Sequence, residues 1–278
     1  MINEEMYAAI VALALEEDLG AAGDITTNST IASDTLATAE FRTRRPGVIA
    51  GLEVAGYVFA TFDPDLEFEA KVSDGDRVEA GRVLAVVGGK ARSILSAERT
   101  ALNFLGRMSG VATQTALLVD AVEGTAARIS DTRKTMPGHR GLDKYAVRMG
   151  GGVNHRFGLH DAVLIKDNHI AAVGSITAAV EAARARFGHT VTVEVEVDSL
   201  RQLEELLETD TDTVLLDNMA PLELAEAVKM VDGRMTTEAS GGVTIETVRE
   251  IAESGVDVIS VGWITHSAPQ LDIGLDFT

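Results

Sequence analysis

From about Ala126 onward one pattern repeats along the chain: a short β-branched run, followed by an amphipathic stretch with helical spacing. The expected strands are ARISDT, AVLIKDN, TVTVEVEV, TVLLDN, RMTTEASGG and DVISVG, and the expected helices include 175–187, 198–208, 221–231 and 244–254. Such βα units, repeating at about 20–30 residues, indicate a parallel sheet with both faces covered. About six units in roughly 140 residues fit a βα barrel better than an open dinucleotide-binding sheet. A Rossmann site has no support, because no GxGxxG motif stands between a strand and a helix.

The first 105 residues or so lack this regular alternation. Residues 3–18 space their apolar side chains as a helix does, and this stretch ends at Gly20. The apolar positions are Met6, Ile10 and Leu13. In the GDITTNSTI segment that follows, Asp24 or Thr26 is expected to cap a short turn.

Two later stretches of this region have a period near two, namely ATAEFRTRRPGVIAG and LEFEAKVSDGDRVEAGRVLAVVGG. The second predicts hairpins with turns at Asp74-Gly75 and Gly88-Gly89. It also resembles the small β sandwich of biotinyl and lipoyl carrier modules. A carrier needs an exposed lysine at the hairpin tip, whereas the tip here is Asp74-Gly75-Asp76, so we do not expect carrier function.

Composition limits the partners. The 278 residues hold 24 Lys plus Arg against 43 Asp plus Glu, a net charge of −19, which argues against nucleic-acid binding because phosphate neutralisation needs a basic surface. Cysteine is absent, which excludes disulfides and a cysteine nucleophile and fits a reducing compartment. No apolar run approaches the roughly 18 residues of a membrane span, and the acidic MINEEMYAAI is unlike a signal peptide. We expect a soluble cytoplasmic protein that binds neither membrane nor nucleic acid.

Residues 128–169 are an exception to this acidity. Their cations are Arg128, Arg133, Lys134, Arg140, Lys144, Arg148, Arg156 and Lys166. Their acids are Asp131, Asp143, Asp161 and Asp167. The segment therefore carries +4, whereas the rest of the chain carries −23. A cationic island in an acidic protein favours a focused site for a small polyanion, and charge alone allows a solvated basic helix face equally well.

In a βα barrel the chemistry lies where strands end and the next loop begins. Arg133 and Lys134 are adjacent cations just past a strand, and an arginine fork and a lysine point charge both suit carboxylate or phosphate oxygens. His155 and Arg156 precede the next strand, and Lys166 ends it after an apolar run. These positions predict a cationic cage at the barrel mouth. His155 on its own is also compatible with a structural role.

Carboxylates follow on the next two strands. Glu194 and Glu196 share one face of TVTVEVEV, and TVLLDN ends in Asp217. Carboxylates at successive strand ends suit Mg²⁺ bound through a phosphorylated substrate. Salt bridges to the nearby cations are the alternative, and both arrangements can hold in the empty protein.

The last two strand ends are rich in glycine. Ser240-Gly241-Gly242 stands just before a helix expected from about Thr244, and Gly262 follows the final strand. Barrels often bind a phosphate between their last two loops, where backbone N–H groups approach the ligand closely. Together with the cage and the carboxylates, this predicts a site that positions and neutralises a phosphorylated substrate without a nucleophile. Phosphoribosyl transfer fits, as does an isomerase or lyase acting on a sugar phosphate.

The segment DTRKTMPGHRGLDKYAVRMGGGVNHRFGLHDAVLIKDNH closely resembles the family of quinolinate phosphoribosyltransferase, also called nicotinate-nucleotide pyrophosphorylase (carboxylating). The resemblance extends to EEDLGAAGDITT, AERTALNFLGRMSGVAT, LLDN, SGGV and LDIGLDF. It implies an α/β fold with an N-terminal α/β sandwich, residues 1–110 completed by the tail 266–278, and a C-terminal open βα barrel over 111–265. It also implies magnesium, NAD biosynthesis, and an obligate homodimer, or a dimer of such dimers, with shared active sites.

Site residues follow from the same resemblance, position by position. Those matching the quinolinate cage are Arg133, His155, Arg156 and Lys166, with Arg99 supplied by the neighbouring subunit. Those matching the site for phosphoribosyl pyrophosphate are Thr132, Lys134, Glu196, Asp217, Ser240, Gly241, Gly242, Val261, Gly262 and Trp263. Glu196 and Asp217 of this set are the expected metal ligands. Trp263 departs from the small residue that relatives commonly carry there.

Two other functions stay open on the sequence. One is a phosphoribosyltransferase of the same fold that acts on a different acid, although all four cage positions are present here. The other is a non-catalytic polyanion-binding protein on the same scaffold, against which the presence of both Glu196 and Asp217 speaks.

Overall fold

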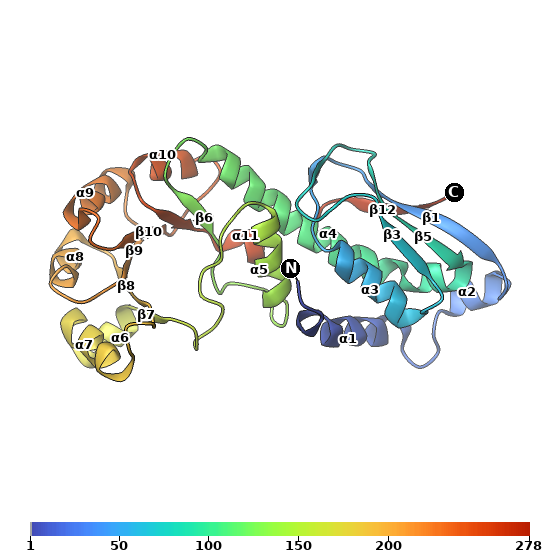
Figure 1. The fold of residues 1–278 in the computed structure, drawn as a ribbon, viewed down its shortest axis with the longest axis horizontal. Coiled ribbons are helices and arrows are strands. Elements are labelled where there is room, and N and C mark those ends of the chain that lie inside the picture. The colour runs from blue at the N-terminus through green and yellow to red at the C-terminus, as the bar shows by residue number, and fades with distance from the viewer. Residues whose placement is uncertain (1) are drawn as a thin grey trace. The chain divides into compact units, whose positions relative to one another are not determined.

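The computed structural model describes residues 2–278, and the chain forms two compact units (Figure 1). One comprises the residues up to Ala116, together with Thr135–Gly151 and Ile264–Thr278. The other comprises Leu117–Lys134 and Gly152–Trp263. We call them the sandwich unit and the barrel unit. Within residues 2–278, no helix combines the length and the apolar character needed to cross a membrane.

The sandwich unit is built on an antiparallel sheet with the order β12-β1-β5-β3, beside the small pair β2-β4. Its strands are β1 (Leu36–Thr43), β2 (Gly47–Val48), β3 (Glu67–Ala70), β4 (Arg77–Val78), β5 (Val83–Lys90) and β12 (Ile273–Phe277). Its helices are η1 (Glu4–Met6), α1 (Ala8–Leu19), α2 (Ile25–Thr30), α3 (Leu52–Phe62) and α5 (Arg140–Met149). Two helices have residues in both units, α4 (Ala91–Ala121) and α11 (Trp263–His266).

An aromatic cluster fills the interior of the sandwich unit. Phe41 of β1 and Phe59 of α3 are fully buried. Phe59 stacks on Phe68 of β3 with ring centroids 5.9 Å apart, and Phe41 meets both rings edge-on at 5.8 Å. Helix α3 is therefore fixed to the sheet by apolar contact, which buries the large rings that contribute most to a core.

Helix α5 is part of the sandwich unit, although the sequence places it in the barrel domain. Asp143 accepts hydrogen bonds from Arg107 of α4 at 2.8 and 3.0 Å, and the Tyr145 hydroxyl donates to Asp74 at 2.8 Å. A Cβ at Gly150 would lie 2.3 Å from the Ala112 carbonyl, so the backbones approach closely here. The cationic island is thereby divided, since Lys144 and Arg148 lie on α5.

Three local expectations for this unit have different outcomes. Asp24 caps α2 as expected, since its carboxylate accepts the Thr27 N–H at 2.9 Å. The face of α1 was predicted wrongly: Val11 and Leu15 are buried, whereas Leu13 is 62% exposed. The predicted turn at Gly88-Gly89 is also wrong.

Gly88 and Gly89 lie inside β5, where they pair with β1. Gly89 has φ of 140°, and a Cβ there would meet Leu66 at 2.6 Å. Gly89 therefore serves its backbone conformation and close packing beside Leu66, and neither glycine reverses the chain. The turn at Asp74-Gly75 is present, and the Asp74 carboxylate accepts the backbone N–H groups of Gly51 and Leu52.

The barrel unit is a six-stranded parallel sheet with the order β6-β11-β10-β9-β8-β7. Its strands are β6 (Arg128–Ser130), β7 (Val163–Ile165), β8 (Val193–Val197), β9 (Thr213–Asp217), β10 (Thr236–Ser240) and β11 (Val258–Ser260). Its helices are α6 (Asp167–Val173), α7 (Ile176–Arg186), α8 (Leu200–Leu206), α9 (Pro221–Val231) and α10 (Val248–Glu253). All six predicted strands are thus confirmed, as is the mixed α/β class.

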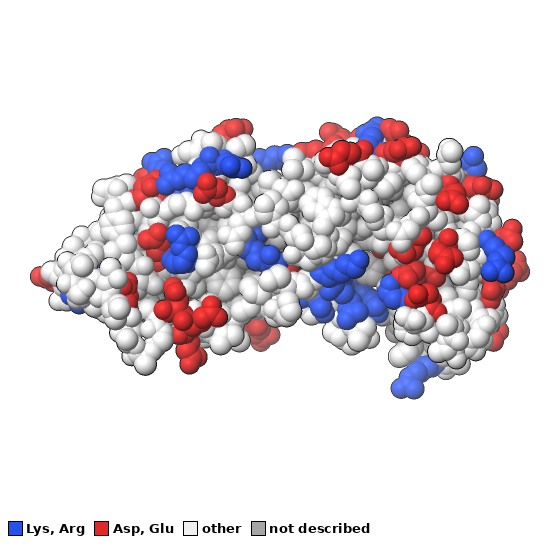
Figure 2. Space-filling model, turned by 180° about the vertical axis from the view of Figure 1, so that it is seen from behind, with Lys and Arg blue, Asp and Glu red and all other residues white. Residues whose placement is uncertain are grey.

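The barrel is open, because β6 and β7 are the edges of its sheet. A single parallel bridge from Ser130 to Val153 extends the sheet beyond β6. Helix α10 begins at Val248 instead of near Thr244, since Thr244 and Thr247 hydrogen-bond one another in a preceding turn. On the face of the molecule in Figure 2, acidic side chains are spread widely and basic side chains form a few groups, as the net charge of −19 leads one to expect.

Candidate active site

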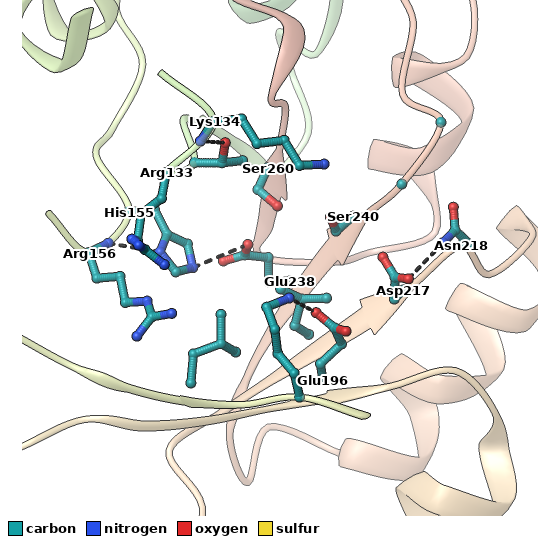
Figure 3. A pocket seen from close by; sticks show the side chains of 16 residues that line it. Arg133, Lys134, His155, Arg156, Glu196, Asp217, Asn218, Glu238, Ser240 and Ser260 are labelled. Atoms are coloured by element: carbon teal, nitrogen blue, oxygen red, sulfur yellow. Dashed lines mark hydrogen bonds and ion pairs between the residues drawn. The ribbon is translucent and has the colours of Figure 1, made fainter. Parts of the chain in front are cut away.

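A cavity of about 600 Å³ opens at the carboxyl ends of the barrel strands (Figure 3). Its walls come from residues of β7, β8, β9, β10 and β11 and from the segments between the strands, all within the barrel unit. The lining residues are Thr132, Arg133, Lys134, His155, Arg156, Leu164, Lys166, Glu196, Leu215, Asp217, Asn218, Glu238, Ser240, Gly241, Gly242 and Ser260. The period of two in a strand directs Leu215 and Asp217 of β9 inward, while Val214 and Leu216 are buried on the other face.

One side of the cavity carries the cations. Asp131 holds the segment that includes His155 and Arg156 in place. The Asp131 carboxylate is fully buried and accepts the His155 N–H at 2.9 Å and the Asn154 side-chain amide at 2.6 Å. The Arg156 guanidinium donates to the Ala162 carbonyl at 3.1 Å. Burial, and then the charge of Arg133, lower the pKa of Arg156 from its ordinary value. Two arginines are therefore held close together on a cavity wall, which suits an anionic ligand.

His155 lies between the cations and two buried carboxylates. Its Nε2 is 3.1 Å from Glu194 Oε2 and 3.6 Å from Glu238 Oε1. Its Nδ1 accepts the backbone N–H of Arg156 at 2.8 Å, so the hydrogen-bond pattern assigns the ring proton to Nε2. Both ring nitrogens thus face protein groups in this structure. We call His155, Glu194 and Glu238 the floor cluster.

The two predicted metal ligands occupy neighbouring strand ends. Glu196 of β8 forms an ion pair with Lys166, which is the salt bridge that the sequence left as an alternative. Asp217 of β9 accepts a hydrogen bond from the Asn218 side chain at 2.6 Å. In Figure 3, Asp217, Asn218 and Ser240 lie across the cavity from Arg133, His155 and Arg156, with Glu238 between the two groups.

The glycine loop after β10 is shaped by close approach. Gly241 and Gly242 have φ of 95° and 60°, in the left-handed region that favours glycine. A Cβ at Gly241 would lie 2.1 Å from Asn218 Oδ1, and one at Gly262 would lie 2.8 Å from Lys134 Cδ. Larger residues at either position would displace groups that form the site.

Four of the predicted site residues do not line this cavity, namely Arg99, Val261, Gly262 and Trp263. Val261 is buried, and its N–H donates to the Ser130 carbonyl at 2.9 Å. Trp263 directs its indole N–H to the Val243 carbonyl at 2.9 Å, which ties the residue after Gly262 to the glycine loop. Arg99 is exposed on α4 in the sandwich unit.

Sequence reasoning missed several lining residues, of which Glu238 is the most informative. Glu238 stands two positions before Ser240, so the alternation that directs Ser240 into the cavity directs Glu238 there as well. Asn218, directly after Asp217, has φ of 56° and donates its N–H to the Ser240 carbonyl. A non-glycine residue in the left-handed region has no clear sequence signal beyond the known tolerance of asparagine.

The open parallel barrel, its cationic cavity and its glycine loop together define an α/β enzyme class that binds anionic substrates. Residues 24–109 match the family of the quinolinate phosphoribosyl transferase N-terminal domain, and residues 111–276 match that of the C-terminal domain. The chain belongs to the quinolinate phosphoribosyltransferase family, and this confirms the resemblance found in its motifs.

Individual relatives agree with the family assignment. The nicotinate-nucleotide pyrophosphorylase (carboxylating) of Mycobacterium leprae is 49% identical, over 95% of this chain and 94% of its own. A probable nicotinate-nucleotide pyrophosphorylase (carboxylating) of Bacillus subtilis is 42% identical, over 94% and 90%. The crystal structure of nicotinate-nucleotide pyrophosphorylase from Ehrlichia chaffeensis has a TM-score of 0.94 and 42% identity, with 98% of both chains covered.

Proposed function

We propose that this chain transfers the phosphoribosyl group of phosphoribosyl pyrophosphate to quinolinate with loss of carbon dioxide. The products are nicotinate mononucleotide and pyrophosphate, a step of NAD biosynthesis, and we place the enzyme in the cytoplasm. The observation that carries the proposal is a single cavity with Arg133, Arg156 and Lys166 for two carboxylates, and the loop of Gly241 and Gly242 for a phosphate. Names of relatives at 42–49% identity support the same activity.

The cavity suits a reaction in which positioning and charge neutralisation do most of the work. The pyridine nitrogen forms a bond to the anomeric carbon while the bond to pyrophosphate breaks, through an oxocarbenium-like transition state. The carboxylate beside that nitrogen then leaves as carbon dioxide, and its electron pair stays on the ring carbon, which takes up a proton. Arg133 and Arg156 would hold the two carboxylates in a fixed orientation until the one beside the ring nitrogen leaves.

Magnesium is part of the proposal, with Glu196 and Asp217 as the residues that would hold it. Two carboxylates at adjacent strand ends of one cavity are hard oxygen donors of the kind that Mg²⁺ prefers. When bound, the ion would neutralise charge on the pyrophosphate. For Glu196 to take this role, Lys166 must release it and turn to a substrate carboxylate.

We further propose that Arg99 acts in the cavity of a second copy of the chain, within a homodimer or a dimer of dimers. In a two-fold assembly such a contribution is reciprocal. The test mixes two inactive variants, Arg99→Ala and Lys134→Ala, under demonstrated subunit exchange. Half of the dimers should be heterodimers with one intact site, so activity should recover to roughly a quarter of wild type. Recovery of no activity would show that Arg99 acts in its own subunit or not at all.

The direct test mixes the purified protein with magnesium, phosphoribosyl pyrophosphate and quinolinate and monitors nicotinate mononucleotide. Nicotinate and nicotinamide run in parallel as substrates that lack the second carboxylate or both. Losing one charge-assisted contact costs roughly 1.5–3 kcal/mol, so nicotinate should be used about ten- to a hundredfold less well. Comparable turnover of nicotinate would favour a same-fold transferase for another acid. Binding without turnover would favour a polyanion-binding protein.

A further inference from the structure

Buried carboxylates lie behind the cavity wall that Glu238 lines, which is unusual beside a cage for anions. Glu194 and Glu238 are only 5% and 4% exposed, and fully buried Asp131 lies nearby. Carboxylates so far from water are kept charged only when partners compensate them. The cations of the rim, Arg133 and Arg156, are the same groups that a substrate dianion would engage.

The floor cluster is short of hydrogen-bond donors. His155 offers one N–H, on Nε2, because its Nδ1 already accepts from the Arg156 backbone. That single proton lies between two carboxylates, 3.1 Å from Glu194 and 3.6 Å from Glu238. Among residues 2–278, no hydrogen bond reaches the buried Oε1 atom of either glutamate. One more proton on the cluster would supply the missing donor.

Glu238 is the group best placed to hold that proton. The groups that act on it are Glu194 from β8, Asp131 after β6, Ser260 from β11 and the ring of His155. The two carboxylates oppose its charge, whereas the Ser260 hydroxyl and His155 favour it. Burial first, and then the charge of Glu194, raise the pKa of Glu238 to about 7. The raised pKa brings the protonation of Glu238 closer to neutral pH than that of an ordinary glutamate.

We propose that Glu238 takes up a proton when a dicarboxylate substrate binds in the cavity, and that the floor cluster holds this proton beside the substrate. The inference rests on the proposed function, because it requires a dianion in the cavity that Glu238 lines. A dianion adds two negative charges near a buried carboxylate and competes for Arg156, whose charge acts on the neighbouring Glu194, so the neutral form of Glu238 becomes favoured. The reaction consumes one proton at the ring carbon that loses carbon dioxide. The substrate complex would already hold one extra proton, on Glu238.

Calorimetry tests the proposal directly. Quinolinate is titrated into the protein without magnesium or phosphoribosyl pyrophosphate, in two phosphate-free buffers whose ionisation enthalpies differ. With Glu238 titrating near pH 7, we expect uptake of up to about 0.9 proton per site at pH 8 and about 0.1 at pH 6. In Glu238→Gln, quinolinate should still bind, but the proton uptake at pH 8 should vanish. Because proton uptake weakens binding as the pH rises, the affinity of the wild type for quinolinate should fall between pH 6 and pH 8, and that of Glu238→Gln should not.

A matched control is Asp257→Asn. It makes the same carboxyl-to-amide change in the barrel unit, on a side chain that bonds Thr237 and is absent from the cavity wall. This variant should take up protons as the wild type does. Quinolinate binding at pH 8 without proton exchange, or uptake that persists in Glu238→Gln, would overturn the proposal.

A second measurement separates this inference from the proposed function. Carbon-13 NMR of the protein with labelled glutamate carboxyls follows Glu238 without any ligand. In the ligand-free protein, one carboxyl signal should titrate near neutral pH, and this signal should be missing from Glu238→Gln. The result does not depend on whether the protein can bind quinolinate. Failure of quinolinate to bind, with that signal present, would count against the dicarboxylate assignment alone. If all glutamates titrate near their ordinary range, the floor cluster does not hold a proton and the proposal fails.

Discussion

The two units differ in what they bury besides aliphatic side chains. The sandwich unit buries the rings of Phe41, Phe59 and Phe68 against one another, whereas the barrel unit buries the carboxylates of Glu194 and Glu238 beside an imidazole. Apolar burial stabilises a fold at any pH, while buried charge costs free energy unless protons and partners compensate it. The aromatic interior of the sandwich unit therefore contributes to stability, whereas the buried carboxylates of the barrel unit lie beside the cavity for a ligand.

The largest effect is expected from emptying the aromatic cluster. Phe59→Ala removes a fully buried ring that packs against Phe41 and Phe68, and a cavity remains. The free energy of unfolding should fall by about 3–5 kcal/mol, measured by urea unfolding with circular dichroism. The loss should be the same at pH 5 and pH 8, because no titrating group is removed. A loss that changes with pH would contradict the contrast between the two interiors.

The charged interior should show the reverse behaviour. The pKa of Glu238 is raised from 4.5 to about 7 on folding, so the folded state holds the proton more tightly. Its contribution to stability is complete below about pH 4.5 and is lost as the pH rises through 7. At about 1.4 kcal/mol per pKa unit, the loss is on the order of 3 kcal/mol.

Glu238→Gln should remove this loss. Relative to wild type, the variant should therefore gain stability between pH 5 and pH 8, measured as the change in urea midpoint. If the difference in urea midpoint between the two proteins is the same at pH 5 and pH 8, the pKa of Glu238 lies in the ordinary range of a glutamate.

A smaller effect is expected from removing the hydrogen bond of Trp263 to the loop of Gly241 and Gly242. Trp263→Phe keeps an aromatic ring but removes the N–H that donates to the Val243 carbonyl. One such bond contributes about 1 kcal/mol, so the KM for phosphoribosyl pyrophosphate should rise about fivefold. The KM for quinolinate should stay unchanged, since the loop lies across the cavity from the cationic side. Equal changes in both constants would indicate a general loss of structure.

The smallest effect is expected on the surface of the barrel unit. Arg249 pairs with Glu253 at 2.7 Å on α10, and both side chains are about half exposed. Arg249→Ala should change the free energy of unfolding by about 0.5 kcal/mol or less. A loss above about 1.5 kcal/mol would mean that the bond from Arg249 to the Glu123 carbonyl holds more than a surface contact does.

The repeating pattern allowed the barrel strands to be predicted because buried parallel strands are short, β-branched and regularly spaced. The strand ends followed from the same pattern, which is why the sequence predicts Arg133, Lys166 and Asp217 as site residues. The sandwich unit was harder to predict. Leu13 has helical spacing but faces water, because the face of a helix that is buried depends on what packs against it.

Other features depend on contacts between distant residues. The bond from Asp131 to the His155 backbone joins groups 24 positions apart, and no local pattern marks it. Gly88-Gly89 has the composition of a turn, yet the pair lies within a strand, where Gly89 has φ of 140° and lies close to Leu66. The ion pair of Lys166 with Glu196 was one of two arrangements that the sequence allowed, because strand ends alone do not fix which cation a carboxylate contacts.

The indole bond to Val243 has a spectroscopic consequence. The chain contains one tryptophan, so all of its tryptophan emission arises beside the loop of Gly241 and Gly242. Indole emission changes in wavelength and intensity when its hydrogen bonding or its contact with water changes. The unlabelled protein thus carries an optical reporter at this loop, which can follow ligand arrival in a stopped-flow instrument without any added dye.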